Sequence, residues 1–154
     1  MYQVNLTELN DSGVTGKAVL VLKDGTLRVN LKARDLVPGM LHPQHVHGLD
    51  GSQNATCPPP SAAGDDDILS VADGLPFYGE VLQPLMPFPM AENGKISYHE
   101  TFSVDGDLAD LSDAVIVIHG GYVDASMSRP CPLPTARSTD PGATWTPAMH
   151  GLAQ

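Results

Sequence analysis

The stretch GKAVLVLKDGTLRVNLKARDL, residues 16–36, decides the fold class of this chain. From Leu27 to Arg34, apolar residues occupy every second position and polar or cationic residues stand between them. Because successive side chains of a strand point to opposite faces, this period of two predicts a strand with one buried and one solvated face. Asp24-Gly25 is a strong signal for a tight hairpin turn, so the residues before it form the partner strand.

The same strand signals recur along the chain. Fifteen Gly and 14 Pro would break most helices, and helical periodicity is hard to find. About seven short strands, the number typical of a β-sandwich or Greek-key β-barrel, predict an all-β fold in which helices are incidental. The further strands are expected within residues 2–9, 44–48, 77–82, 94–104 and 113–123.

The length of 154 residues fits a single domain spanning residues 1–154. A long segment between His47 and Lys95 is rich in Pro, Gly, Asp and Ser, and irregular segments of this length often form the wall of a functional site. Residues 132–154 are rich in Pro, Thr and Gly and are expected to wrap the surface as a tail.

The charge balance excludes some classes of partner. Asp and Glu number 18 against 8 Lys and Arg, and the formal net charge of -10 repels nucleic-acid phosphates and anionic lipids. No stretch reaches the roughly 18 consecutive apolar residues of a membrane span, and residues 1–10 lack the pattern of a signal peptide. We therefore expect no nucleic-acid partner and no membrane insertion, whereas the compartment stays open.

Three of the six histidines lie within residues 42–47. In a strand, His45 and His47 point to the same side, about 7 Å apart at Cα, while Val46 points to the core. Two imidazoles in this arrangement can converge on one metal ion, although an isolated His-x-His pair is more often two surface histidines.

Further ligands can come from two other predicted strands. His119 ends the most apolar strand, where Ile116 and Ile118 have the core-facing parity, so His119 faces outward. His99 is likewise on the outward parity of its strand. His42, before a proline, and His150, in the tail, are interpreted as bystanders. Neutral nitrogens without thiolate or carboxylate favour Cu, Zn, Ni or Fe over Ca and Mg.

Cys57 and Cys131 are too few for a disulfide scaffold and lack the spacing of a four-sulfur zinc site. They either pair with each other or are two buried thiols. Each lies in a Pro-rich stretch, where a covalent bond would restrain loops that no strand pairing restrains, and this favours pairing.

With these residues in view, the chain resembles the Cu,Zn superoxide dismutase family, in its copper-only branch. QHVHG resembles the copper-binding His-x-His strand of the family, and AVIVIHGG resembles its later strand ending in one copper-binding His. The resemblance spans residues 1 to about 131. It implies a Greek-key barrel, copper held by His45, His47 and His119, a Cys57–Cys131 disulfide and an active-site Arg129.

The sequence also departs from the family pattern. No histidine lies between His47 and His99, so the bridging His and the zinc loop of the family have no counterpart, and the zinc site is expected to be absent. His99 is the best substitute for the fourth ligand. Arg129 stands two residues before Cys131 instead of three, and a Pro-rich stretch replaces the final strand of the family.

The resemblance implies one copper per chain, superoxide as substrate and oxygen and hydrogen peroxide as products. It also leaves a homodimer open, and the implied disulfide suggests the periplasm or the cell exterior. Two alternatives remain. A copper-carrying module could keep the fold without turnover, and a cupin-type metalloenzyme could use the same histidines, although Asp50 stands where cupins usually carry a Glu.

Overall fold

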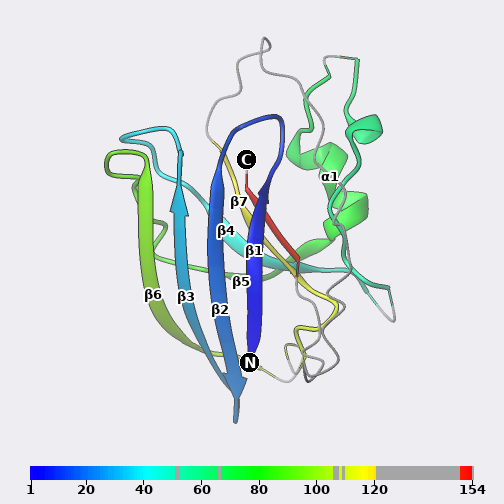
Figure 1. Ribbon diagram of the computed structural model, residues 1–154. Coiled ribbons are helices and arrows are strands. Elements are labelled where there is room, and N and C mark those ends of the chain that lie inside the picture. The colour runs from blue at the N-terminus through cyan, green and yellow to red at the C-terminus, as the bar shows by residue number, and fades with distance from the viewer. Residues whose placement is uncertain (51–52, 66, 106–107, 109, 121–149, 154) are drawn as a thin grey trace, which may run out of the picture.

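A computed structural model of the chain describes residues 1–50, 53–65, 67–105, 108, 110–120 and 150–153. The described residues form eight strands, which make up a curled sheet, and one α-helix beside it (Figure 1). The helix α1 spans Val71–Tyr78, and a 3-10 turn covers Pro60–Ala62. The strands are β1 (Tyr2–Glu8), β2 (Thr15–Lys23), β3 (Thr26–Arg34), β4 (Gln44–Gly48), β5 (Glu80–Pro84), β6 (Lys95–Ser103), β7 (Val115–Ile118) and β8 (His150–Ala153).

The hairpin predicted from residues 16–36 is confirmed. β2 and β3 pair without interruption from Thr15 opposite Arg34 to Lys23 opposite Thr26. Asp24 and Gly25 both have positive φ, +50° and +69°, as the turn between two such strands requires. The alternation in β3 matches burial, since its Leu and Val side chains are fully buried and its charged ones exposed.

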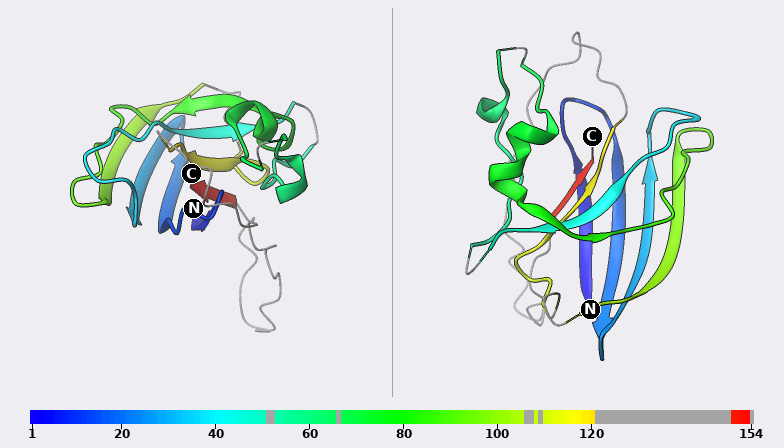
Figure 2. Two further views of the ribbon diagram at one scale, coloured as in Figure 1. Left: turned by 90° about the horizontal axis from the view of Figure 1, so that it is seen from above. Right: turned by 180° about the vertical axis from the view of Figure 1, so that it is seen from behind.

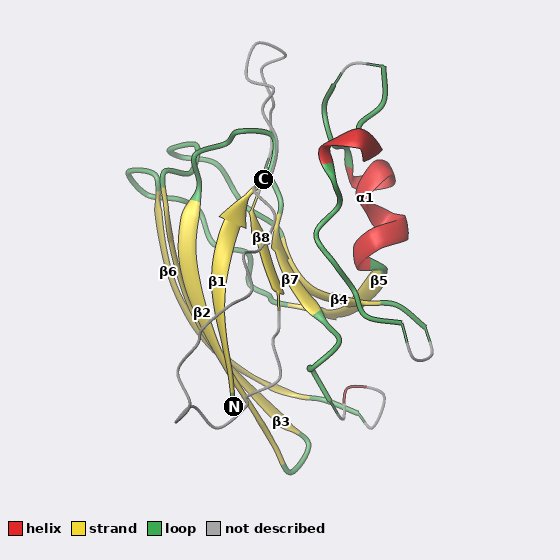
Figure 3. Ribbon diagram, turned by 45° about the vertical axis from the view of Figure 1, so that its right-hand side comes forward, coloured by secondary structure: helices red, strands yellow, loops and turns green. Residues whose placement is uncertain are grey.

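The strands form one hydrogen-bonded sheet in the order β5-β4-β7-β8-β1-β2-β3-β6. All pairs are antiparallel except those of β8, which runs parallel to both β7 and β1. The expectation of an all-β chain is therefore confirmed. The expected tail over residues 132–154 is wrong for β8, which lies inside the sheet (Figure 3), and residues 132–149 lie outside the described part.

The sheet curls so that its two halves face each other across the main core (Figure 2). Val46, Ile116 and Ile118 from β4 and β7 pack in the same buried cluster as the inward side chains of β1, β2, β3 and β6. The Tyr98 hydroxyl on β6 donates to the carbonyl oxygen of Met86, just beyond β5, at 3.0 Å. Contacts of side chains, in addition to strand pairing, thus hold the two edges of the sheet together.

A second apolar cluster covers the other side of β4 and β7. Val115 and Val117 of β7 pack there against side chains of the segment between β4 and β5. This segment includes α1 (Figure 3). The buried members of this cluster are Leu9, Ala55, Leu69, Tyr78, Val115 and Val117. β4 and β7 are therefore covered on both faces.

Helix α1 was not expected from the sequence, because Gly74 and Pro76 lie inside it. Its start carries a capping box, in which the Ser70 hydroxyl accepts from the Asp73 backbone N–H and the Asp73 side chain accepts from that of Ser70. This Ser-x-x-Asp pattern is a local signal for the start of a helix, but the strand signals on either side of it favoured an all-β interpretation. No helix among the described residues is long and apolar enough to cross a membrane.

Asn10 ties the segment that carries α1 to the turn after β1. Its side-chain amide donates to the Leu69 carbonyl oxygen at 3.0 Å and accepts from the Leu69 N–H at 2.8 Å. Asn10 is 9% exposed and has a φ of +53°, a conformation that Asn tolerates better than most residues. Both hydrogen-bonding groups of Leu69 thus depend on one side chain.

We expect Asn10→Ala to lower the free energy of unfolding by about 1–3 kcal/mol, because it leaves two buried backbone groups of Leu69 without partners. Urea unfolding measures the difference. Asn54→Ala, at an exposed position, is the matched control and should change stability by less than about 0.5 kcal/mol. Equal stabilities of the two variants would contradict the role given to Asn10.

Candidate metal centre

The pairing of β4 with β7 brings three histidines together. His45 and His47 lie on the face of β4 opposite to the buried Val46, as predicted from the period of two. His45 stands opposite Val117, and the backbone N–H of His119 donates to the Pro43 carbonyl oxygen at 2.7 Å. His119 therefore lies diagonally across from His45, on the same face of the neighbouring strand.

The three imidazoles converge. One ring nitrogen from each of His45, His47 and His119 lies within 4.8 Å of the corresponding nitrogen of the other two. The ring centroids are 5.4 Å apart for His45 and His47, 5.1 Å for His45 and His119, and 5.6 Å for His47 and His119. Nitrogen ligands of one ion about 2.0–2.1 Å from each nitrogen are separated by roughly 3–4 Å. Small rotations of the rings therefore suffice to coordinate a metal.

The orientation of His47 is set by the residue after α1. His47 Nδ1 lies 2.9 Å from the carbonyl oxygen of Gly79, and since a carbonyl only accepts, Nδ1 carries the proton and donates. The unprotonated nitrogen is then Nε2, which is buried without a hydrogen-bond partner among the described residues. A hydrogen bond of this kind fixes the ring orientation and raises the basicity of a metal-binding His.

Only glycine fits at position 79. Its φ is +80°, and a Cβ built there would lie 1.9 Å from the carbonyl oxygen of Gly48. The backbone of Gly79 therefore approaches β4 closely, directly after His47. This close approach is what brings the Gly79 carbonyl within hydrogen-bonding distance of the imidazole.

The cluster is largely removed from water. His47 is 2% and His119 is 7% exposed, and the partly exposed His45 forms the side that meets solvent. Among the described residues, His45 Nδ1 and His47 Nε2 are buried without a hydrogen-bond partner. Burying a polar nitrogen without a partner costs on the order of 1–3 kcal/mol, and a metal ion bound to both would offset that cost. The donor set therefore fits a metal ion.

Burial also favours the neutral form of His45 and His47. It lowers the pKa of His45, with a smaller contribution from the neighbouring His47, and it lowers the pKa of His47 against the opposing effects of the Gly79 hydrogen bond and the Glu80 charge. Imidazole binds a metal only in its unprotonated form. The site is thus held in the metal-binding state at neutral pH and somewhat below.

Aromatic rings pack against two of the three imidazoles. Tyr78 lies edge-on to His47, with ring centroids 4.8 Å apart, and Phe88 lies edge-on to His45 at 5.3 Å. Tyr78, Gly79 and Phe88 were not singled out from the sequence. The only signal was the long segment between His47 and Lys95, which was expected to form a site wall, and all three residues belong to it.

His99 is not part of this cluster. It lies on the exposed face of β6, an edge strand, where its Nδ1 donates to the side-chain oxygen of Asn30 on β3. The inward side chains of β6 and β4 share the main core, so His99 points away from the metal centre. The parity predicted for His99 was right, but the curl of the sheet separates it from the other three histidines.

His42 supports the site without joining it. It is 1% exposed, and its Nδ1 donates to the carbonyl oxygen of His119 at 3.1 Å. The other ring nitrogen lies 3.4 Å from the Val37 carbonyl oxygen. His42 thus holds the backbone at the end of β7, where the third histidine is placed, and is more than a residue at a bend. His150 lies in β8.

Two predicted functional residues lie outside the described residues. Arg129 and Cys131 both fall within residues 121–149, so the proposed roles of the arginine and of a Cys57–Cys131 disulfide stay predictions. The described part of the chain holds Cys57 beside the second apolar cluster and no disulfide.

Neither a family model, nor a curated protein, nor a solved structure matches this chain. The resemblance to the Cu,Zn superoxide dismutase family thus rests on the motifs of the sequence alone.

We expect Gly79→Ala to weaken metal binding by about 10–100-fold, the range typical for loss of a partner that orients a metal-binding His. Isothermal titration with Cu²⁺ or Zn²⁺ measures the affinity. Gly13→Ala is the matched control, because Gly13 has a similar φ of +69° but open space around its Cα. If both variants bind metal as the unchanged chain does, the Gly79 carbonyl does not orient His47.

The metal-free chain should lose stability as the pH falls below about 6.5. The pKa of His45 and of His47 is lower in the folded than in the unfolded chain, so below about 6.5 the unfolded chain binds more protons and is favoured. Above that pH both states are neutral and the effect vanishes. Urea unfolding between pH 7.5 and 5 should show a shallower loss in His45→Gln/His47→Gln, and an unchanged slope would contradict this account.

Proposed function

We propose that the chain binds one copper ion at His45, His47 and His119 and dismutates superoxide. The observation that carries the metal site is the convergence of three ring nitrogens within 4.8 Å on two paired strands. In addition, His45 Nδ1 and His47 Nε2 are buried without a hydrogen-bond partner among the described residues. Neighbouring strands of a sheet are rigid supports, and a rigid ligand set is what a preorganised metal site requires.

The donor chemistry favours copper. The set consists of imidazole nitrogens without carboxylate, which disfavours Ca²⁺ and Mg²⁺, and nitrogen sites bind Cu²⁺ more tightly than the other divalent first-row metals. Zinc and iron are the competitors that metal analysis has to exclude. The proposal includes no zinc site, because the sequence has no histidine between His47 and His99.

Dismutation is proposed from the motif order that resembles the dismutase family: His-x-His, Cys57, His119, Arg129 and Cys131. Copper would supply the one-electron chemistry, in which one superoxide is oxidised to oxygen and another, with two protons, is reduced to hydrogen peroxide. The chain itself would hold the imidazoles, exclude bulk water with Tyr78 and Phe88, and admit substrate at the partly exposed His45.

The proposal extends to the parts of the family pattern that accompany this chemistry. These are a Greek-key, dismutase-like arrangement of the strands, a Cys57–Cys131 disulfide and an oxidising compartment such as the periplasm or the cell exterior.

A copper-binding module without turnover is the second candidate. Glu80 lies close enough to His47 for its charge to oppose the lowering of the His47 pKa by burial, and this negative charge also opposes the approach of an anion such as superoxide. The described Lys and Arg residues all lie on β2, β3 and β6, away from the three histidines. Arg129 is therefore the cation on which capture of superoxide would depend.

Replacement of single histidines tests the metal site. We expect His47→Ala and His119→Ala to lose most of the copper, measured as copper per chain after dialysis, because each removes one of three ligands. His99→Ala is the matched control and should keep about one copper per chain, since His99 faces away from the site. Full copper content in His47→Ala or His119→Ala would show that the site is wrong.

Superoxide decay after pulse radiolysis then separates the two functions. A dismutase should react near the diffusion limit of about 10⁹ M⁻¹s⁻¹, and Arg129→Gln should slow it without loss of copper. If superoxide decays no faster with the copper-loaded chain than in buffer alone, the copper-binding module without turnover is supported. Iron or manganese in the natively purified chain would instead favour a cupin-type enzyme.

A further inference from the structure

The cations of this acidic chain are gathered on one side of the sheet. Every Lys and Arg among the described residues lies on the outward parity of β2, β3 or β6, and the strand register brings them into adjacent rows. Lys17 stands opposite Lys32, and Arg34 stands between Thr15 and Lys95. We call this surface the cationic face; its charged members are Lys17, Lys23, Arg28, Lys32, Arg34 and Lys95.

No carboxylate compensates these charges within the face. The outward positions of β2, β3 and β6 carry no Asp or Glu, although the chain has 18 of them. The ion pairs found in the described residues are Lys23 with Asp24 at 3.9 Å and Arg34 with Asp35 at 3.5 Å. Both acids follow their partners directly at strand ends, and all four side chains are largely exposed, so these pairs neutralise little.

The pair Lys17 and Lys32 is unfavourable for the free chain. Like charges directly opposite each other in a sheet repel and destabilise it. Neighbouring uncharged side chains, such as Asn30 and Ser97, show that the face does not need charge at every outward position to be soluble. Repulsion of this kind is expected at a functional surface, where a binding partner supplies the compensating negative charge.

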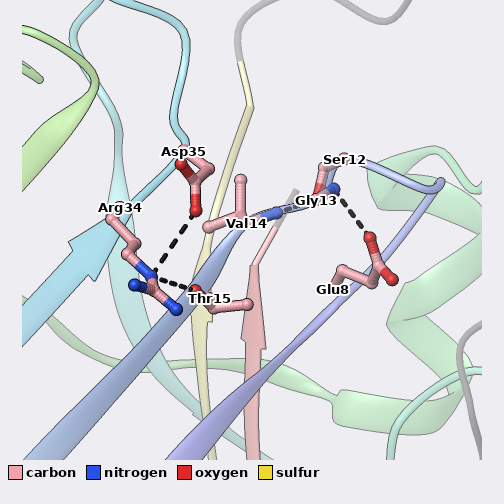
Figure 4. A network of polar contacts seen from close by, with 7 residues as sticks. All are labelled: Glu8, Ser12, Gly13, Val14, Thr15, Arg34 and Asp35. Carbon is pink, nitrogen blue, oxygen red and sulfur yellow. Dashed lines mark hydrogen bonds and ion pairs between the residues drawn. The ribbon is translucent and has the colours of Figure 1, made fainter.

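A hollow of about 320 Å³ lies at the most densely charged end of the face. Three cationic residues, Lys17, Lys32 and Arg34, line it. Thr15 and the small residues Gly16 and Ala33 complete the lining. The Arg34 Nε donates to the Thr15 hydroxyl oxygen at 2.8 Å, which together with Asp35 orients the guanidinium (Figure 4). The aliphatic stems of long cationic side chains form the walls of such a hollow, and their charged ends form its rim.

The shape of the face indicates a planar partner. Three strands about 4.8 Å apart and nine residues long give a strip of roughly 10 by 27 Å. Because the sheet curls around the main core, the strip lies on its convex side (Figure 2), and a convex wall meets a plane along such a strip. The outward positions of β2, β3 and β6 hold no Phe, Tyr or Trp, so the stacking that binds single-stranded nucleic acid is missing there.

We propose that the cationic face docks on the phosphate groups of an anionic lipid bilayer. Thr15, Asn30, Ser97 and Thr101 stand among the cations as further hydrogen-bond donors to headgroup oxygens. The net charge of -10 does not prevent this contact, because charges farther than the Debye length of about 8 Å are screened at physiological salt. Cations that lie within this Debye length of the bilayer are attracted to its negative surface.

Docking in this way would leave the metal centre accessible. The inward sides of β2, β3 and β6 and of β4 and β7 share the main core, so their outward sides point in opposite directions. The three histidines would then face away from the bilayer. The proposal does not rest on the identity of the metal or on catalysis.

Cosedimentation of the full chain with lipid vesicles tests the proposal. We expect binding to phosphatidylcholine vesicles that contain phosphatidylglycerol, no binding to phosphatidylcholine alone, and weakening as salt rises from about 0.01 M to about 0.15 M. Lys17→Gln/Lys32→Gln should weaken binding by about thirtyfold, because two near-surface cations are lost. Thermal unfolding should show this variant folded and no less stable, since a repulsive pair is removed.

The control variant is Gln53→Glu/Asn54→Glu, which changes the net charge by the same two units at exposed positions outside the face. At about 0.15 M salt, where the Debye length is about 8 Å, it should bind anionic vesicles within about twofold of the unchanged chain if the location of the charges decides. Equal weakening in both variants would show that only net charge matters and would overturn the proposal. So would failure of the unchanged chain to bind anionic vesicles at low salt, including the case in which it binds a soluble polyanion such as dextran sulfate.

Discussion

The antiparallel pairing of β4 with β7 is the interaction on which the rest of this structure depends. It sets Val46 beside Ile116 on one face, where both enter the main core, and it sets His45 and His47 beside the third histidine on the other. A slip by one residue would exchange the two faces and bury the imidazoles in the main core. The apolar side chains that stabilise the sheet therefore also fix the register of the three clustered histidines.

The second face of these strands would be solvated in a simple two-layer fold, but here the segment that carries α1 covers it. Asn10 anchors this segment at Leu69, and Gly79 brings it against β4 at the point where its carbonyl accepts from His47. This cover removes water from the imidazoles, lowers the pKa of His45 and of His47, and orients His47. The geometry of the three histidines thus depends on this segment as much as on the strands.

The alternation of apolar and polar residues along the strands also separates the charges of the molecule. The alternation of β2 and β3 that buries Leu20 and Leu31 places Lys17 and Lys32 on the opposite side, and β6 adds Lys95 beside them. The remaining described surface carries acids and no Lys or Arg. An overall charge of -10 therefore describes neither the metal centre nor the cationic face, because screening makes each respond to its own neighbours.

The sequence by itself determined the all-β class, the β2–β3 hairpin and the parity of the histidines, because a period of two and an Asp-Gly turn are local signals. It could not separate His99 from the other candidates, since all four share the outward parity and only the curl of the sheet turns β6 away from β4. It also missed Gly79 and the insertion of β8 between β7 and β1, which depend on contacts between residues distant in sequence. Tertiary structure decided which outward faces are covered, which charges gather, and therefore where a metal and a partner can bind.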